Sequence, residues 1–226
     1  MAELEVKPYG KDRKIIDRVL QSGIPAMQIE IPEDTLIVLG RGGKPEREIF
    51  IDAVLAAGIP IYRREGGGGT VVLDPGNVVL YAGVPAEGIE RCSEFIELFT
   101  SWLAQGFDDL GIEGVHRAGK SDLATGNRKI GGSSYRLVRG CFLYTVSLLV
   151  DPQVELLEKF LKYPPREPDY RNGRSHREFV WSLKETAGID SPKELAAGLE
   201  RVLNLQDIAE KIISPPRPDP PKPVSQ

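Results

Sequence analysis

The sequence is poor in the residues that form covalent or metal-held frameworks. It contains two cysteines and two histidines among 226 residues, and the cysteines, Cys92 and Cys141, do not form a Cys-x-x-Cys pair. Small secreted scaffolds depend on many cysteines, and structural zinc sites on clustered Cys and His ligands. The composition therefore argues against a disulfide-stabilised fold and against a structural zinc site.

Long apolar runs and a basic excess are also missing. No apolar run reaches the length of a membrane span, and residues 1–13 are polar and charged, with no signal-peptide core. The formal net charge is −4, whereas nucleic-acid-binding proteins usually carry a basic excess. We therefore expect a cytoplasmic protein that binds neither membranes nor nucleic acid.

Glycine is concentrated in one place, four in a row at 66–69, directly after Arg63, Arg64 and Glu65. This is not a Walker loop, because the chain has no Gly-x-x-x-x-Gly-Lys-Ser/Thr sequence. Successive glycine N–H groups can surround an anion, and arginine adds a charged fork suited to phosphate or carboxylate. The stretch predicts either a phosphate- or acyl-adenylate-binding loop, or a flexible glycine hairpin with two surface arginines.

A second stretch places a lysine before another glycine pair, with Lys129 and Ile130 followed by Gly131 and Gly132. Glycines in or beside a strand often mark close approach of the backbone to a ligand. Lysines on edge strands are equally typical, because they block aggregation. The residues of this stretch alone favour the edge-strand lysine and leave the ligand site as the alternative.

Helical and strand patterns mix without strict alternation, which predicts an α/β (α+β) fold with one mixed β-sheet flanked by helices. Helices are expected over 12–20, 46–57, 87–106, 154–161 and 191–213. Strands are expected over 26–31, 35–39, 59–64, 77–84, 111–115, 122–124, 128–130 and 140–150. Residues 1–213 are expected to form one domain, and the proline-rich residues 214–226 a disordered tail.

Together, the two glycine-containing stretches resemble the two signatures of the lipoate–protein ligase family. The first is Arg-Arg-x-x-Gly-Gly-Gly-x-Val-x-x-Asp-x-Gly-Asn, from Arg63 to Asn77. The second is Asp122-Leu123 and then Arg-Lys-Ile-x-Gly-Ser-Ser-x-Arg, from Arg128 to Arg136. The similarity runs from about Leu36 to Leu183. The family shares one fold with biotin ligases and octanoyltransferases, so the resemblance implies a class II synthetase/biotin-ligase-like catalytic domain.

The resemblance implies two-step chemistry. Lipoate and MgATP would form lipoyl-adenylate and pyrophosphate, and the acyl group would then pass to a lysine of a lipoyl-domain acceptor protein. Lys129 matches the family's essential lysine, which would hold both the carboxylate and the α-phosphate. Asp122 would contact the nucleotide or the metal, or orient the incoming amine, and the metal ligands stay open.

The resemblance also implies a set of residues that bind the nucleotide or the acyl group. The two arginines in this set would bind the phosphates of ATP, unless one of them supports the loop instead. The set consists of Arg63, Arg64, Gly67, Gly68, Gly69, Thr70, Val71, Asp74, Asn77, Asp122, Ile130, Gly132 and Ser133.

Octanoyltransferases of the wider group work through a cysteine nucleophile. The positions where they carry it, around 114–116 or 174–176, have no cysteine here, and Cys141 lies in an apolar strand, where a thiol is usually inert. This favours the ATP-dependent ligase. The alternatives are an octanoyl or lipoyl transferase that uses an acyl-carrier or protein donor, and a non-catalytic adenylate-binding paralogue.

Three departures from the family pattern surround the expected acyl pocket. The first helix lacks the usual Asn-Leu-Ala, Leu73 replaces a histidine, and Tyr144-Thr145 stands where His-Gly is usual. The choice between lipoate and a related medium-chain acid such as octanoate therefore stays open.

Two questions about partners also stay open. The accessory C-terminal domain of longer ligases is missing, so the small domain is either a separate accessory subunit or not needed. The arginine-rich loop over 166–177 is either a steering surface for an acidic acceptor or a solvated basic loop.

Overall fold

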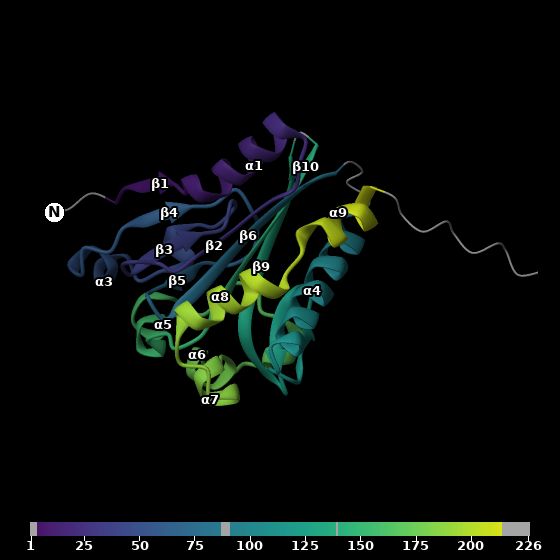
Figure 1. Cartoon of the computed structure of the whole chain (residues 1–226). Helices are drawn as coiled ribbons and strands as arrows, with labels where there is room; N and C mark the ends of the chain where they lie inside the picture. Colours follow the sequence, from purple (N-terminus) through teal and green to yellow (C-terminus); the bar gives the residue numbers. More distant parts are fainter. Residues whose placement is uncertain (1–3, 87–90, 139, 214–226) are drawn as a thin grey trace, which may run out of the picture.

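The computed structural model describes residues 4–86, 91–138 and 140–213. Its strands form a six-stranded and a four-stranded sheet, with helices packed against them (Figure 1). The strands are β1 Val6–Pro8, β2 Ala26–Glu30, β3 Leu36–Leu39, β4 Ile61–Arg63, β5 Val71–Leu73, β6 Asn77–Pro85, β7 Val115–Ala118, β8 Asp122–Thr125, β9 Arg128–Val138 and β10 Cys141–Leu149. The helices are α1 Gly10–Ser22, α2 Pro45–Glu48, α3 Ile51–Ala56, α4 Cys92–Asp109, α5 Val154–Phe160, the 3-10 turn η2 Asp169–Arg171, α6 His176–Phe179, α7 Leu183–Ala187, α8 Pro192–Val202 and α9 Leu205–Ile213.

The larger sheet is antiparallel, in the order β2-β6-β10-β9-β8-β7. Its central strand β10 pairs along its whole length with β6, and both strands are buried almost throughout. Apolar side chains of α4, α8 and α9 cover one face and form the main core with the sheet. Helix α1 lies on the opposite face, where Ile15, Ile16 and Val19 pack against β6 and β10.

The smaller sheet is mixed, in the order β1-β4-β3-β5. Strand β4 runs parallel to both β1 and β3, and β5 is antiparallel to β3. As its continuous apolar run predicts, β3 is an inner strand, with Ile37, Val38 and Leu39 at most 1% exposed. Because β3 and β4 are parallel and in register at their last residues, the segments that follow them leave from the same edge of the sheet.

The α+β class with flanking helices is confirmed, but the strands divide between two sheets instead of forming one mixed sheet. Strand β9 also extends to Val138, beyond the end predicted at Ile130. A Cβ on Gly131 would stand 3.0 Å from Cδ2 of Leu148, so this glycine permits close packing inside the strand.

Two predicted helices are interrupted in the structure. The helix expected over 46–57 consists of α2 and α3, because Ile49 takes an extended conformation and pairs with Leu161 in an isolated bridge. The helix expected over 191–213 consists of α8 and α9, because Leu203 is extended. Tertiary pairing and packing override the helical periodicity at both points.

Some predictions fall on residues that the structure does not describe. The predicted tail over 214–226 and the first residues of the predicted helix, 87–90, lie outside the described ranges. Within those ranges, no helix combines the length and the apolar composition needed to cross a membrane.

Candidate functional site

The two glycine-containing sequence motifs meet in the structure. The segment 64–70, here called the glycine loop, joins β4 to β5 and lies against β9. A Cβ on Gly66 would stand 2.7 Å from Oγ of Ser134, and Arg136 pairs with Glu65. The backbone of the loop can come this close to β9 only because no side chain intervenes.

Arg64 holds the glycine loop from the inside. Its Nη2 donates to the carbonyl oxygens of Gly67 and Gly69, both at 2.7 Å, and its Nη1 donates to Val38 O at 3.2 Å. The side chain is 8% exposed. Since these loop carbonyls turn inward, Arg64 supports the loop, which is the role that the sequence left open for one of the two arginines.

The loop N–H groups are available for a ligand. Among the residues that the structure describes, the backbone N–H groups of Gly67, Gly68 and Gly69 form no hydrogen bond. Gly68 takes a φ of 90°, a conformation that favours glycine. Adjacent unpaired N–H groups create a small region of positive potential, so the loop is suited to bind phosphate or carboxylate oxygens.

The other predicted arginine stabilises the neighbouring turn. Arg63 Nη1 donates to the carbonyl oxygens of Gly40, Arg41 and Gly43 at 3.0, 3.2 and 2.8 Å. This turn follows β3 and passes directly beside the glycine loop, because a Cβ on Gly40 would stand 2.0 Å from Gly68 O. Phosphate binding by Arg63 stays a prediction.

Two carboxylates that the sequence did not single out also fix the loop. Glu48, at the end of α2, accepts hydrogen bonds from the hydroxyl and the N–H of Thr70 at 2.6 and 3.2 Å. Asp12, in the first turn of α1, accepts from the N–H of Glu65 at 2.8 Å and is fully buried. The sequence did contain one indication that Asp12 is special. It lies on the apolar stripe of α1 with Ile15, Ile16 and Val19, where a charged residue is unexpected.

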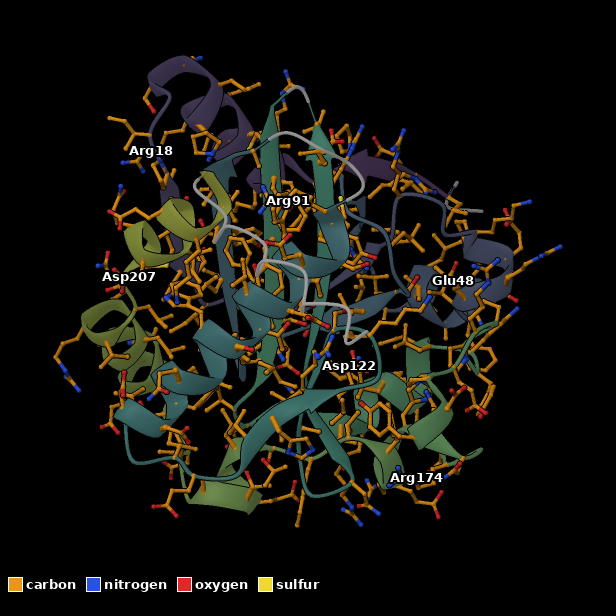
Figure 2. The ribbon with its side chains drawn as sticks, turned by 90° about the vertical axis from the view of Figure 1, so that its right-hand side faces the viewer. Arg18, Glu48, Arg91, Asp122, Arg174 and Asp207 are labelled. Carbon is orange, nitrogen blue, oxygen red and sulfur yellow. The ribbon has the colours of Figure 1, made fainter. Side chains whose placement is uncertain are left out.

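Lys129 lies on β9 beside the part of the strand that contacts the loop. Its Nζ donates to Oδ1 of Asp122 on β8 at 2.8 Å, and its side chain is 26% exposed. A Cβ on Gly132 would stand 2.8 Å from this Nζ, so the lysine side chain runs along the strand toward Gly132. Figure 2 labels Glu48 and Asp122, the acidic residues that contact the loop and the lysine, respectively.

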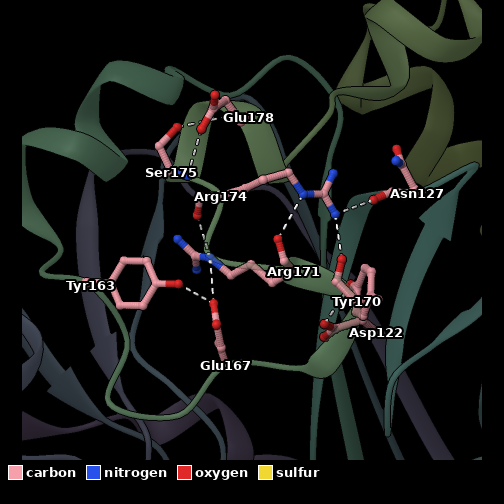
Figure 3. Close-up of polar contacts among 9 residues, drawn as sticks. All are labelled: Asp122, Asn127, Tyr163, Glu167, Tyr170, Arg171, Arg174, Ser175 and Glu178. Atoms are coloured by element: carbon pink, nitrogen blue, oxygen red, sulfur yellow. Dashed lines mark hydrogen bonds and ion pairs between the residues drawn. The ribbon is translucent and has the colours of Figure 1, made fainter.

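The other oxygen of Asp122 is held by Tyr170, which the sequence did not single out. Its hydroxyl donates to Oδ2 at 2.9 Å (Figure 3). Desolvation by burial and the charge of Asp122 raise the pKa of Tyr170, so the phenol keeps its proton. Both carboxylate oxygens of Asp122 are thereby oriented, and Lys129 has one defined counter-ion.

Replacing Gly132 by alanine tests whether the path of the lysine matters. The new Cβ would come within 3 Å of Nζ and Cε of Lys129, at 2.8 and 2.9 Å, and the flexible end of the lysine would have to move. We expect a loss of roughly a hundredfold in the turnover that depends on Lys129, since misplacement by about an ångström has that effect. Enzyme assays and thermal unfolding of Gly132→Ala would check this, and a folded variant with unchanged turnover would contradict it.

Asp74 and Asn77 have structural roles in the turn between β5 and β6. The carboxylate of Asp74 accepts from the N–H groups of Gly76 and Gln153 at 2.7 and 2.9 Å, and Asn77 Oδ1 accepts from Asp74 N at 2.8 Å. Both residues are at most 3% exposed. They lie at the opposite end of β5 from the glycine loop, so they shape the scaffold and do not line the site.

The remaining predicted residues divide between the site and the core. The Oγ of Ser133 donates to Ser121 O at 2.7 Å and ties the turn before β8 to β9. Ile130 is fully buried in the main core, so only its backbone is available to a ligand. Val71 lies on β5, partly buried, and packs against the cluster between α1 and the sheets.

The arginine-rich loop is mostly occupied by its own contacts (Figure 3). Arg174 donates to the carbonyl oxygens of Tyr170, Arg171 and Asn127, and Arg171 is 4% exposed. Arg177 pairs with Glu155. These contacts favour a structural role of the loop over a steering surface.

The cysteines differ in burial. Cys141 is fully buried on β10, and burial raises the pKa of its thiol to about 11. A thiol that stays protonated at neutral pH is a poor nucleophile, which agrees with the expectation from its apolar strand. Cys92 is partly buried at the start of α4.

The fold and the site together define an α+β domain in which an open glycine loop lies against the strand that carries Lys129. Lipoate-protein ligase A bound with ATP has a similar fold, with a TM-score of 0.68 and 20% identity over 84% of this chain and 82% of that chain. The putative lipoate protein ligase of Thermoplasma acidophilum with bound lipoic acid gives a TM-score of 0.69 and 19% identity over 93% and 92%. The bi-partite ligase from that organism, studied with its E2 lipoyl domain, gives 0.71 and 19% over 93% and 91%.

The family model of the lipoyl protein ligase A/B catalytic domain matches residues 12–213, so the chain belongs to this family. The lipoate–protein ligase of Streptococcus pyogenes is 29% identical over 127 residues, which are 56% of this chain and 37% of that protein. A putative lipoate-protein ligase A of Aeropyrum pernix is 30% identical over 140 residues, or 62% and 51%. The chain thus spans about half the length of these relatives, or less.

Proposed function

We propose that this chain is an ATP-dependent lipoate–protein ligase, which activates lipoate as lipoyl-AMP and transfers the lipoyl group to a lysine of a lipoyl-domain protein. One observation carries the proposal. The glycine loop, whose N–H groups at Gly67, Gly68 and Gly69 are unpaired, lies against β9 at Ser134, and the ammonium group of Lys129 lies beside Gly132 on the same strand. Fixed donors and a cation around one position stabilise negative charge that develops during acyl activation.

The proposed residues fit both half-reactions. In the first, a carboxylate oxygen of the acid attacks the α-phosphorus of ATP and pyrophosphate leaves. In the second, the acceptor amine attacks the acyl carbonyl, AMP leaves, and the amine releases one proton. Lys129 would neutralise the oxygens shared by both transition states, while the glycine loop would hold the phosphate or acyl oxygens. Asp122 and Tyr170 would keep the ammonium group in place.

Magnesium would enter with the nucleotide. The described residues contain no cluster of three or more His, Cys, Asp or Glu side chains suited to hold a metal ion. The oxygens of Asp122 are already taken by Lys129 and Tyr170. Magnesium is commonly bound by substrate phosphates with only one or two carboxylates, so we assign it no ligand from this chain.

A separate small subunit is part of the proposal. The chain matches only part of its relatives, and one protein of similar fold is a bi-partite ligase. In this arrangement, the chain would carry the activation chemistry, and the other polypeptide would assist transfer to the acceptor in the cytoplasm. Formation of adenylate by this chain alone would show that the first step does not need the subunit.

The proposal is tested by incubating the purified chain with ATP, Mg²⁺ and either lipoate or octanoate, followed by mass spectrometry. We expect acyl-AMP and pyrophosphate in amounts at least equal to the enzyme, and none when either substrate is omitted. The acid that gives more adenylate identifies the preferred acyl group. No adenylate with either acid, from folded protein, would contradict activation by this chain.

The second candidate is an acyltransferase that takes octanoate or lipoate from an acyl-carrier or protein donor without ATP. It requires a reactive thiol, and the high pKa of buried Cys141 disfavours it. ATP-independent transfer that is lost in Cys92→Ser or Cys141→Ser would establish this alternative. A non-catalytic adenylate-binding protein would instead bind acyl-AMP without forming it.

A further inference from the structure

Asp12 connects the glycine loop to the core of the domain. It lies in the first turn of α1, on the face that packs against β6 and β10, and is fully buried. One carboxylate oxygen accepts the N–H of Glu65 at 2.8 Å, and the backbone of Gly66 also donates to the carboxylate. The other oxygen lies 3.4 Å from the hydroxyl of Thr145 on β10.

These contacts hold the loop immediately before the open N–H groups. Arg64 fixes the carbonyls of the loop and Glu48 fixes its end at Thr70. Asp12 completes the support at the start of the loop. An ionised carboxylate can accept on both oxygens, whereas a neutral carboxamide offers only one acceptor oxygen and two donors. The ionised carboxylate accepts from the loop N–H and from the Thr145 hydroxyl at once, whereas a carboxamide would turn a donor toward one of them, and the Thr145 hydroxyl would then have to accept.

Asp12 and Thr145 come from two of the places where the sequence departs from the family pattern. Asp12 lies in the first helix, which lacks Asn-Leu-Ala, and Thr145 belongs to the Tyr-Thr pair that stands for His-Gly. The structure shows that the two residues meet beneath the loop. They form one unit, since the hydroxyl of Thr145 donates to the carboxylate that binds the loop.

Ionisation of Asp12 lowers the stability of the folded chain. Desolvation by burial raises its pKa from 3.8 to about 6, although Arg64, Gly66, Thr145 and Arg136 favour the charge. The folded chain thus binds this proton more tightly than the unfolded chain, and ionisation of Asp12 lowers stability as the pH rises from about 4 to about 6. Buried charges kept at such a cost are typical of functional sites.

We propose that Asp12 is a positioning residue of the ligase reaction, whose ionised carboxylate keeps the N–H groups of Gly67, Gly68 and Gly69 turned toward the bound anion. This inference rests on the proposed function. Asp12 touches neither substrate in this arrangement and acts through the backbone of Glu65 and Gly66.

A pH dependence follows from the same contacts. The titratable and charged groups that act on Asp12 come from several elements: Arg64 in the loop, Arg136 on β9, Tyr9 before α1 and Tyr81 on β6. Burial raises the pKa of Tyr9 to about 12 and that of Tyr81 further, so both stay neutral while Asp12 titrates. Below about pH 6, protonation of Asp12 replaces one of its two acceptor oxygens by a hydroxyl donor and weakens its hold on the loop, so we expect loop order and adenylate formation to fall together.

The test compares Asp12→Asn with Asp17→Asn, a control on the same helix whose carboxylate pairs with Arg13 and with no other described side chain. Hydrogen exchange of the backbone over 64–70 is measured between pH 5 and 8, corrected for intrinsic rates, and needs no substrate. Its readout comes from the bonded N–H groups of Arg64, Glu65 and Thr70, because those of 67–69 are unpaired. We expect the wild type and the control to lose protection as the pH falls through about 6. Asp12→Asn is expected to show fast exchange in this segment at every pH, and normal protection of β6 and β10.

Activity gives the second readout. We expect adenylate formation by Asp12→Asn to be about tenfold or more below wild type, mainly through a higher KM for ATP and without the pH dependence near 6. Thr145→Val is expected to move the wild-type midpoint to higher pH, because it removes a hydrogen bond to the ionised form. If the wild type forms no adenylate, the proposed function fails, while the exchange data still decide the role of Asp12.

Two results would overturn the inference. One is wild-type exchange over 64–70 in Asp12→Asn at all pH values. The other is faster exchange throughout β6 and β10 in that variant, which would make Asp12 a residue of general stability.

Discussion

Lys129→Ala is expected to abolish formation of acyl-adenylate while the domain stays folded. Among the residues that the structure describes, Lys129 is the one cation paired with Asp122, and its ammonium group lies beside Gly132 on β9. Loss of a preorganised group that stabilises transition-state charge reduces the rate on the order of a hundred- to a thousandfold. ATP–pyrophosphate exchange in the presence of lipoate would measure the effect.

The fold should tolerate this change. The side chain of Lys129 is 26% exposed, and its partner Asp122 keeps the hydrogen bond from Tyr170. Thermal unfolding should therefore differ little between Lys129→Ala and wild type, because partly exposed ion pairs contribute little to stability. Lys193→Ala on α8, an exposed lysine away from the site, is the control and should keep full exchange activity. Retained exchange activity in folded Lys129→Ala would show that Lys129 is not the catalytic residue.

Local chemistry accounts for those features of the candidate site that the sequence indicates. The open N–H groups at 67–69 and the lysine beside Gly132 depend on what glycine permits, which can be inferred without a structure. The inner position of β3 also follows from its uninterrupted apolar run. Each of these features is encoded by neighbouring residues.

The residues that the sequence did not reveal act through contacts distant in the chain. Asp12 meets Glu65 across 53 positions, and Tyr170 meets Asp122 across 48. The sequence also did not show that Arg63 and Arg64 donate to backbone carbonyls. The parallel pairing of β3 with β4 places Arg63 beside the turn that follows β3. The division of the strands between two sheets also depends on contacts between distant segments, so the sequence did not predict it.

Gly40→Ala is expected to have the second large effect, because Gly40 lets the turn after β3 pass beside the glycine loop. A Cβ at this position would stand 2.0 Å from Gly68 O, 3.1 Å from Gly68 C and 3.5 Å from Nη2 of Arg64. Gly68 O belongs to the backbone, so the loop has to shift by about an ångström to reach an allowed contact distance. We expect adenylate formation to fall roughly a hundredfold, as for other misplacements of that size, with a loss of about 1–3 kcal/mol in the free energy of unfolding.

Gly42→Ala is the matched control for this prediction, since it adds the same methyl group two positions further along the same turn. A Cβ on Gly42 meets nothing within 4 Å, and its φ does not fall in the left-handed range, so neither the loop nor the backbone is strained. This variant should match wild type in exchange activity and in thermal unfolding. If both variants retain full activity, the exact placement of Gly68 is not needed for anion binding. If both lose it equally, the flexibility of the turn matters and its contact with the loop does not. Loss in Gly40→Ala alone would tie the activity to the position of the glycine loop.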